Sequence, residues 1–280
     1  MRYHDLYRRS VQRLTDTSSS EPADHGYDVQ LIMEAAFGLS RTDFWMNRDR
    51  EIQDMTARRR FYRYLNRLLA HEPPGYILRE KEFFSLPFSV GPGVLIPRPE
   101  TEILVEKALP HLTATSIVLD IGCGCGNIAI TLALHAGCTV VACDSSAAAL
   151  RILRTNARRH GVEGRVRPVM HDLFPPRPMQ FDLIVSNPPY LTEGEWRSLP
   201  PRIRLYEPKE ALVSGRDGIE VLERIISAGR ARLRPRGRLF LEIGHGQRDR
   251  IQALLATHGW GFCEFFDDYA GIPRIAGGTA

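Results

Sequence analysis

The sequence has no apolar run that approaches the roughly 18 residues needed to span a membrane. Its first residues, MRYHDLYRRSVQRL, have no apolar core before a small-residue cleavage site, so we expect no signal peptide. The five cysteines are an odd number, and four of them lie in apolar or glycine-rich stretches. We interpret them as reduced thiols in a cytoplasmic protein, which excludes a disulfide framework and gives no reason to expect a membrane partner.

The sequence also lacks a strong charge of either sign. The net charge of +4 is too small by itself to imply a nucleic-acid partner. Residues 1–80 contain 13 Arg and 12 Asp or Glu, so the run Arg58-Arg59-Arg60 is interpreted as a solvated helix face and not as an RNA-binding stripe. Cys123 and Cys125 have C-x-C spacing, but no second Cys or His pair nearby completes four zinc ligands, so we predict no metal site.

The first quarter of the chain is helical in pattern. Residues from about 27 to 70 carry apolar side chains at helical spacing, and Ser40 or Thr42 is a candidate helix N-cap. The polar, turn-rich residues 15–26 predict a loop between the first helix and the next. We therefore predict a small, all-helical N-terminal domain over residues 1–71.

The pattern of residue types changes at residue 72 and again at residue 95. Residues 72–94 place prolines and glycines around short β-like runs, which predicts a hairpin linker with YILREKEFF and LPFSVG as its strands. Over residues 95–280, apolar runs alternate with helical segments, which is typical of an α/β fold with a mainly parallel sheet. The predicted strands are 116–120, 139–143, 165–169, 181–185, 238–242 and two short ones near the end; the predicted helices are 127–136, 146–160, 217–234 and 247–258.

The first of these strands runs into a glycine-rich turn, SIVLDIGCGCGNIAI, with Asp120 as its last residue. Gly122, Gly124 and Gly126 allow positive φ and a close ligand approach, although tight strand-to-helix turns also use glycine for steric reasons alone. A dinucleotide fingerprint would need glycine where Asn127 stands, and no P-loop Lys-Ser/Thr follows. An acidic residue suits a cationic or amino-bearing group better than a pyrophosphate. S-adenosylmethionine, which has a sulfonium and an amino group but no phosphate, fits best.

Two more aspartates end strands of the same predicted sheet. Asp144 follows the glycine turn by about twenty residues, where a carboxylate accepts both ribose hydroxyls of a bound nucleoside. Its alternative role is to N-cap the helix that begins near Ser146. Asp172 ends the third strand, where an adenine edge would lie, although Asp also commonly starts a loop.

The fourth strand, Phe181–Val185, stops at an Asn-Pro-Pro-Tyr turn. A single proline would be enough to terminate a strand, whereas Pro188 and Pro189 together make a rigid turn beside the same crevice. The Asn187 side-chain oxygen and the Pro188 carbonyl can each accept one N–H of a planar –NH₂ group, which favours a pyramidal nitrogen in the transition state. Tyr190 is placed to stack on the substrate. The motif has no strong general base, so we expect the proton to leave after methyl transfer.

These stretches occur in a family-specific order. DIGCGCG, ACD and SNPPY resemble the class I S-adenosylmethionine-dependent methyltransferases, and GLSRTD, EPPGYILREKEFFSLPFSV, LIPRPETE, YEPKEAL and FLEIGHGQ are similar to the bacterial PrmC/HemK protein-glutamine methyltransferases. The resemblance implies a Rossmann-like, seven-stranded, mainly parallel sheet and a helical domain that helps to dock the substrate. It implies methylation of the side-chain amide of the glutamine in the Gly-Gly-Gln motif of peptide chain release factors, with S-adenosylhomocysteine as the second product.

The resemblance also implies residue roles. In IPRPETE, Arg98 and Glu100 would cover the methionine end of the cofactor, although Pro99 with the glutamates is also good helix-start chemistry. Leu173 would lie beside the adenine, and Glu207 would support the substrate loop. The predicted cofactor-binding residues are Arg98, Glu100, Asp120, Gly122, Cys123, Gly124, Cys125, Gly126, Asp144, Asp172, Leu173 and Asn187; the predicted substrate-binding residues are Asn187, Pro188, Pro189, Tyr190 and Glu207, of which Asn187, Pro188 and Tyr190 are catalytic.

Two alternative functions stay open at this point. A DNA adenine methyltransferase acts on a similar amino group and uses a similar motif, but it must flip a base and needs a recognition domain and a basic cleft. The charge-balanced residues 1–80 offer neither, so we expect no direct nucleic-acid recognition. A catalytically silent methyltransferase fold used for binding would have lost Asn187 or the glycines, and all of them are present.

Overall fold

The computed structural model describes residues 1–17 and 24–280. Half of the loop predicted for residues 15–26, residues 18–23, lies outside these ranges. The prediction is wrong at both ends, because helix α1 (Tyr3–Thr17) and helix α2 (His25–Phe37) extend into the predicted loop. No helix within the described ranges is both long and apolar enough to cross a membrane.

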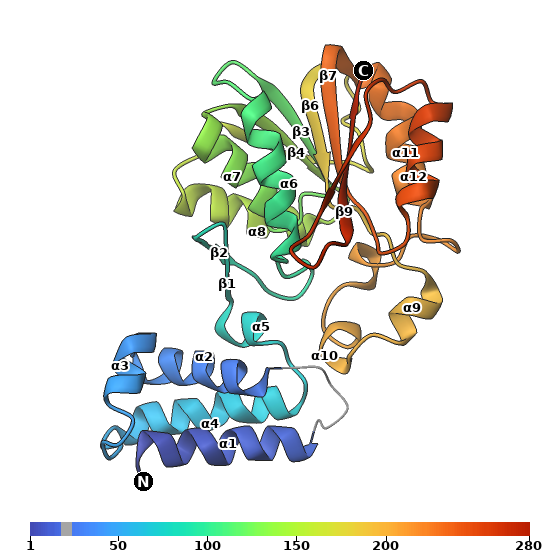
Figure 1. The fold of residues 1–280 in the computed structure, drawn as a ribbon. Helices are drawn as coiled ribbons and strands as arrows, with labels where there is room; N and C mark the ends of the chain where they lie inside the picture. Colours follow the sequence, from blue (N-terminus) through green and yellow to red (C-terminus); the bar gives the residue numbers. More distant parts are fainter. Residues whose placement is uncertain (18–23) are drawn as a thin grey trace. The chain divides into compact units, whose positions relative to one another are not determined.

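The described chain forms two compact units (Figure 1). The helical unit consists of Met1–Arg79 and Pro200–Tyr206, and the sheet unit consists of Glu80–Leu199 and Glu207–Ala280. The domain limits read from the sequence, with a separate linker over 72–94, stay a prediction.

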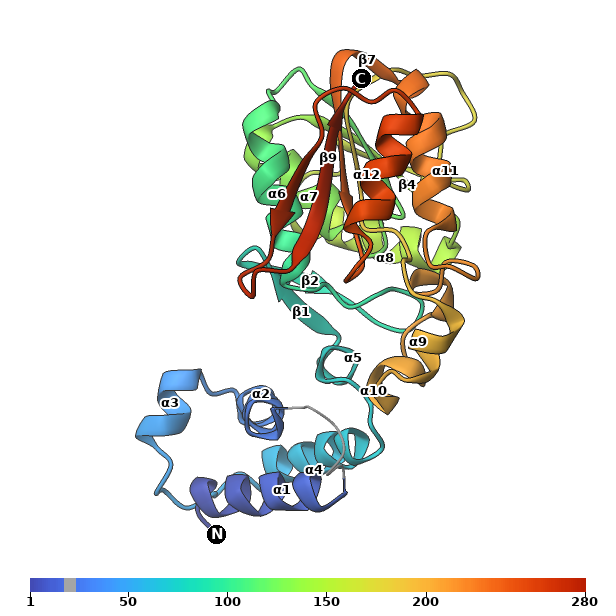
Figure 2. The same ribbon diagram turned by 45° about the vertical axis from the view of Figure 1, so that its right-hand side comes forward.

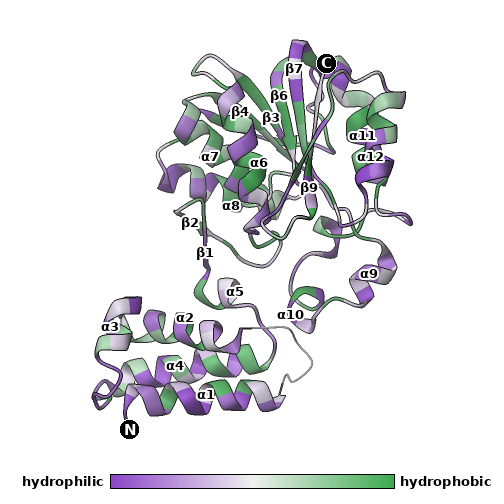
Figure 3. Ribbon diagram, viewed as in Figure 1, coloured by the Kyte–Doolittle hydropathy of each residue, from purple (hydrophilic) through white to green (hydrophobic). Residues whose placement is uncertain are grey.

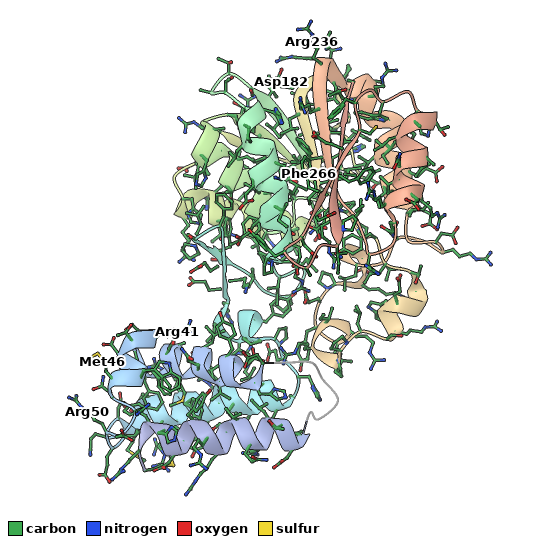
Figure 4. The ribbon with its side chains drawn as sticks, in the orientation of Figure 1. Arg41, Met46, Arg50, Asp182, Arg236 and Phe266 are labelled. Atoms are coloured by element: carbon green, nitrogen blue, oxygen red, sulfur yellow. The ribbon has the colours of Figure 1, made fainter. Side chains whose placement is uncertain are left out.

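The helical unit forms because amphipathic helices bury one face each in a common core. Ser40 caps α3 (Arg41–Met46) in a capping box with Asp43, as one of the two predicted caps. Figure 4 shows Arg41, Met46 and Arg50 at the surface of this unit. Its other helices are α4 (Met55–Leu69), α5 (Pro74–Leu78) and α10 (Pro201–Arg204), and its core includes Leu6, Val29, Ile32, Met33, Phe44, Phe61 and Leu65.

Side-chain contacts join the segment Pro200–Tyr206 to the rest of the helical unit. Arg202 pairs with the carboxylate of Asp28 on α2 at 2.9 Å. The Tyr206 hydroxyl donates to the Ala70 carbonyl at 2.7 Å. Burial raises the pKa of Asp28, and the Arg202 guanidinium opposes that rise. No signal in the sequence predicts this return of the chain.

The predicted hairpin is present, with β1 (Glu80–Phe83) antiparallel to β2 (Leu86–Ser89). Phe84 and Ser85 link the strands with φ angles of 53° and 58°, the left-handed conformation of a two-residue hairpin turn. The first strand, predicted as YILREKEFF, is wrong over its first residues. These residues form the end of α5, which stops where Arg79 adopts a φ of 59°.

The sheet unit contains the seven-stranded sheet, in the order β5-β4-β3-β6-β7-β9-β8. The first five strands in this order are parallel, and β9 runs antiparallel to both of its neighbours, β7 and β8. The strands are β3 (Ile117–Ile121), β4 (Thr139–Asp144), β5 (Val166–Met170), β6 (Phe181–Ser186), β7 (Leu233–Glu242), β8 (Glu264–Asp267) and β9 (Pro273–Thr279).

Helices cover both faces of this sheet (Figures 1 and 2). Figure 3 shows the hydrophobic strands between the two helical layers. One buried core joins the sheet to α6, α7 and α8, and a second joins it to α11 and α12. These helices are α6 (Glu100–Ala108), α7 (Asn127–Ala136), α8 (Ala147–Arg159), α11 (Glu220–Gly229) and α12 (Arg248–Thr257); α9 (Glu193–Arg197) is a short helix of the same unit.

The predicted limits near β7 need correction. The helix predicted for 217–234 ends at Gly229 and is followed by a 3₁₀ turn, and the strand predicted from Arg238 begins at Leu233. The register to β6 shifts between Phe181 and Leu183, and Arg236 has a φ of 66°. An irregular strand of this kind breaks the alternating pattern by which strands are recognised. Figure 4 places Asp182 and Arg236 at this same end of the sheet.

Candidate active site

The chain adds β4 and β5 on one side of β3 and then β6 and β7 on the other, so the winding direction of the sheet reverses between β3 and β6. Ligands of open α/β sheets bind outside the carboxyl ends of the strands at such a point. A cavity of about 380 Å³ lies there, within the sheet unit. The predicted site residues that line it are Arg98, Gly122, Cys123, Gly124, Cys125, Asp144, Asp172, Leu173, Asn187, Pro188 and Pro189, whereas Glu100, Asp120, Gly126, Tyr190 and Glu207 lie outside its wall.

The three glycines of the glycine turn are needed for two different purposes. Gly122, Gly124 and Gly126 all have positive φ, at 68°, 52° and 87°. A Cβ on Gly122 or Gly124 would meet no atom within 4 Å, so that side of the turn is open to a ligand. A Cβ on Gly126 would lie 3.0 Å from the side chains of Ile130 and Leu153. Gly126 therefore serves helix packing, and the first two glycines serve ligand approach.

Asp144 fixes this turn from β4. One carboxylate oxygen accepts the Gly124 N–H at 2.9 Å, and the other accepts the Ser146 N–H at 2.8 Å. The alternative role predicted for Asp144, as N-cap of α8, is wrong, because the Ser146 hydroxyl caps that helix by accepting from Ala149. Each Asp144 oxygen retains lone pairs for a hydroxyl donor on the cavity side.

Asp120 is fully buried behind the turn. One carboxylate oxygen accepts the Ala129 N–H at 3.1 Å, and the other has no hydrogen-bond partner among the described residues. Burial, with a smaller repulsion from Asp144, raises the pKa of Asp120 to about 7. A buried oxygen without a donor beside an open glycine turn fits a ligand that brings an amino or cationic group. S-adenosylmethionine has both.

The two cysteines of the turn are buried thiols. Burial is the main cause that raises the pKa of Cys125, to about 12, and it raises the pKa of Cys123 well above its ordinary value. Both side chains therefore stay protonated at neutral pH and act as small apolar wall residues. Across the described chain, His, Cys, Asp and Glu form no group of three or more that could hold a metal ion.

Asp172 and Leu173 form the far wall of the cavity. Asp172 is exposed and pairs with Arg224 on α11 at 2.6 Å. Leu173 adopts a φ of 62°, which is uncommon for a residue with a side chain. Leu173 lines the cavity, where its apolar side chain can contact a planar ring.

Arg98 is held in the cavity wall by Glu207. The two side chains form an ion pair at 2.6 Å, and the other Glu207 oxygen accepts the Ile96 N–H at 3.0 Å. Glu207 is almost fully buried, so it acts on the Ile96–Arg98 segment from behind. Among the described residues, Glu207 makes its hydrogen bonds to Ile96 and Arg98 and none to the Asn-Pro-Pro-Tyr turn, so its predicted support of the substrate loop is not seen. Glu100 lies in the first turn of α6, as the helix-start interpretation predicts.

Behind the Asn-Pro-Pro-Tyr turn lies a chain of hydrogen bonds that sequence reasoning missed. Asn187 donates from its side-chain nitrogen to the Thr101 hydroxyl at 3.0 Å, and Thr101 donates to Glu242 at 2.5 Å. The Tyr190 hydroxyl donates to the other Glu242 oxygen at 3.2 Å. Thr101 and Glu242 are each 1% exposed. Tyr190 is thus directed toward Glu242, and its predicted stacking on substrate stays a prediction.

Gln247 holds the backbone of the same turn. Its side-chain nitrogen donates to the carbonyls of Tyr190 and Gly218, at 2.9 Å and 3.1 Å, and its oxygen accepts the Gly244 N–H at 2.8 Å. Gly218 approaches so closely that a Cβ there would lie 2.7 Å from the Tyr190 carbonyl oxygen. The GHGQ part of the sequence therefore supports the turn from behind.

Glu242 makes stability depend on pH. Burial raises its pKa from 4.5 to about 7, so the folded protein keeps a proton that the unfolded chain has already released between these values. Its stabilising contribution is present below the unfolded pKa and is lost as the pH rises through 7. We expect the free energy of urea unfolding of the wild type to fall, relative to Glu242→Gln, by about 2–3 kcal/mol between about pH 5 and 7.5. Parallel pH curves for the two proteins would contradict this assignment.

Comparison with known proteins identifies the family. The profile described as the PrmC N-terminal domain matches residues 5–78, and that described as the methyltransferase small domain matches residues 99–199. The release factor glutamine methyltransferase of Geobacter sulfurreducens is 36% identical over 280 residues, or 96% of each chain. That of Nitratidesulfovibrio vulgaris is 38% identical over 96% of this chain and 92% of its own. The chain belongs to the release factor glutamine methyltransferase family.

Solved structures agree with this family at the level of the fold. A methyltransferase from Pyrococcus furiosus is 18% identical and superposes with a TM-score of 0.54, covering 76% of this chain and 96% of its own. The T. Thermophilus 16S rRNA N2 G1207 methyltransferase, in complex with AdoMet and guanosine, is 20% identical with a TM-score of 0.53, covering 71% and 49%. The predicted fold class, a mainly parallel seven-stranded sheet with a helical N-terminal part, is confirmed, and so is the prediction of a methyltransferase.

Proposed function

We propose that this protein transfers the methyl group of S-adenosylmethionine to the side-chain amide nitrogen of the glutamine in the Gly-Gly-Gln motif of peptide chain release factors. The observation that carries the proposal is that a chain 36% identical to such an enzyme over 96% of its length has Asn187 and Pro188 in the wall of the same cavity as the glycine turn. The cytoplasmic location expected from the sequence belongs to this proposal.

The cofactor half of the cavity is assigned to residues that fit S-adenosylmethionine. Asp144 has lone pairs for the ribose hydroxyls, and the open side of Gly122 and Gly124 admits the ligand. Asp120, buried behind the turn, adds a carboxyl group whose negative charge favours a cationic ligand. A cation held nearby favours the ionised form of Asp120. When bound, this cofactor supplies an electrophilic methyl group.

The substrate half is assigned to two acceptors. The Asn187 side-chain oxygen and the Pro188 carbonyl accept the two N–H bonds of the glutamine amide, whose nitrogen lone pair is otherwise delocalised into its carbonyl. These acceptors stabilise the positive charge that develops on nitrogen, and positioning provides the rest of the rate. The nitrogen loses one proton to water after the methyl group arrives.

We assign the helical unit to docking the release factor. The family profile for the N-terminal domain, which covers residues 5–78, supports this assignment. Residues 1–80 contain 13 Arg against 12 Asp or Glu, so this stretch lacks the large net positive charge that favours nucleic-acid binding.

The test is methyl transfer from labelled S-adenosylmethionine. We expect label on a release factor, none on the same factor with its Gly-Gly-Gln glutamine changed to alanine, and none on duplex DNA. Label on DNA but not on the factor would favour an adenine methyltransferase. A titration that finds no S-adenosylmethionine binding at micromolar concentration would instead favour a silent scaffold.

A further inference from the structure

When Glu242 is ionised, as it is above its pKa of about 7, the hydrogen-bond donors and acceptors behind the Asn-Pro-Pro-Tyr turn can be paired in only one way. An ionised carboxylate accepts hydrogen bonds and donates none, so the single hydroxyl proton of Thr101 points to Glu242 at 2.5 Å. The Thr101 oxygen is then left as an acceptor toward Asn187, 3.0 Å away. The only Asn187 group that can satisfy it is the –NH₂. With Glu242 ionised, the orientation of the Asn187 amide thus follows from counting donors and acceptors.

We propose that Thr101 and Glu242 form a buried positioning relay that holds the Asn187 side-chain oxygen toward the substrate amide. This inference rests on the proposed function, in which that oxygen accepts an N–H of the glutamine. A flipped amide would present two donors to a substrate –NH₂ that also donates, and transfer would stop. Thr101 and Glu242 touch no reacting atom, so both are positioning residues.

Glu242 also contacts Tyr190, the last residue of the Asn-Pro-Pro-Tyr turn. Tyr190 donates its hydroxyl to the Glu242 oxygen that Thr101 does not use, and Gln247 donates to the Tyr190 carbonyl. One Glu242 oxygen therefore supports Asn187 through Thr101, and the other supports Tyr190 directly. Two charged groups, Glu100 on α6 and Arg274 on β9, act on Glu242 with opposite signs.

The relay joins elements that are distant in sequence. Thr101 lies in the first turn of α6, 86 residues before Asn187, and Glu242 ends β7, 141 residues after Thr101. The helix-start sequence IPRPETE thus has a second use, because it places a hydroxyl between the carboxylate and the amide. A threonine whose only task was to begin a helix would have no reason to be buried at 1% exposure between two polar side chains.

The test compares Thr101→Val, which removes the hydroxyl at nearly constant volume, with Thr101→Ser, which keeps it. At about pH 8.5, where Glu242 is ionised, we expect Thr101→Val to lower kcat for release-factor methylation by about 10- to 100-fold with little change in KM, because one buried donor loses its acceptor. Thr101→Ser should restore kcat to within about threefold of the wild type. Thr131→Val is the matched control, since Thr131 is equally buried and donates only to the Asn127 carbonyl within its own helix, at 2.6 Å.

A second readout needs no turnover. The Asn187 side-chain –NH₂, assigned in a nitrogen-15 spectrum by its loss in Asn187→Ala, should exchange its hydrogens slowly in the wild type and in Thr101→Ser. In Thr101→Val it should exchange about tenfold faster or more, because the acceptor is gone. Equal exchange in all three proteins, or an equal loss of kcat in Thr101→Val and Thr131→Val, would overturn the relay. Inactivity of the wild type on release factor with slow exchange intact would overturn the proposed function and leave the relay standing.

Discussion

Asn187→Ala is expected to lower the rate of methyl transfer by about a hundredfold to a thousandfold, the effect typical of removing one preorganised polar group that stabilises developing charge. The side chain provides one of two acceptors for the amide and is held in place from behind by Thr101. Alanine removes that acceptor and leaves the Thr101 oxygen without its donor. The loss should fall on kcat, because the hydrogen bond strengthens as the nitrogen becomes positive.

Single-turnover methylation of release factor measures this loss, with S-adenosylmethionine affinity measured by calorimetry on the same sample. Affinity should change by less than about threefold, since the hydrogen bonds that hold the glycine turn involve Asp144, Asn156 and the Cys143 carbonyl and not Asn187. Asn187→Asp is the informative companion, because it keeps an acceptor but cannot donate to Thr101. It should lie between alanine and wild type. Transfer by Asn187→Ala at more than about a tenth of the wild-type rate would remove the assigned role.

Asp144→Ala is expected to weaken S-adenosylmethionine binding by about a hundredfold. The change leaves the partly buried backbone N–H groups of Gly124 and Ser146 without an acceptor, and an unsatisfied donor costs up to about 1–3 kcal/mol when it is shielded from water. It also removes the proposed partners of the ribose hydroxyls. The ligand must then order a loosened glycine turn when it binds.

The matched control is Asp182→Ala. Asp182 also accepts a backbone N–H, from Ile117 at 2.7 Å, but it lies near the start of β6, at the end of the sheet away from the cavity. Calorimetric titration should therefore give nearly wild-type affinity for Asp182→Ala despite a lower unfolding temperature. Equal affinities for the two variants would show that Asp144 does not hold the ligand.

Local signals explain which parts of this fold could be predicted. The strand Phe181–Val185 was recognisable because five apolar-rich residues precede two prolines, and the structure extends it only to Ser186. The helices predicted for 127–136 and 146–160 agree with α7 and α8 to within one residue at each end, because a glycine turn and a capping serine mark where they begin. The first hairpin strand was misread because tyrosine, isoleucine and leucine favour strands by composition, yet Pro73 and Pro74 start a helical turn there.

The support of the site could not be predicted, since it depends on pairings between distant segments. Thr101 in ETE and Glu242 in FLEIG each look ordinary, and only the fold brings them together across 141 residues. The same holds for Asn156, which ties the Ser89 backbone and the Cys125 carbonyl to α8. Buried polar partners of this kind leave no periodic trace in a single sequence.

The return of Pro200–Tyr206 to the helical unit means that three peptide connections join the two units, after Arg79, Leu199 and Tyr206. The helical unit is consequently not a cassette that can be exchanged between relatives by cutting at one junction. A chimera joined at residue 79 would inherit a foreign partner for Asp28, which is buried against Arg202. To exchange the helical unit between two genes and keep its contacts, the stretches that encode Met1–Arg79 and Pro200–Tyr206 must be exchanged together. A domain attached through a single linker needs only one such exchange.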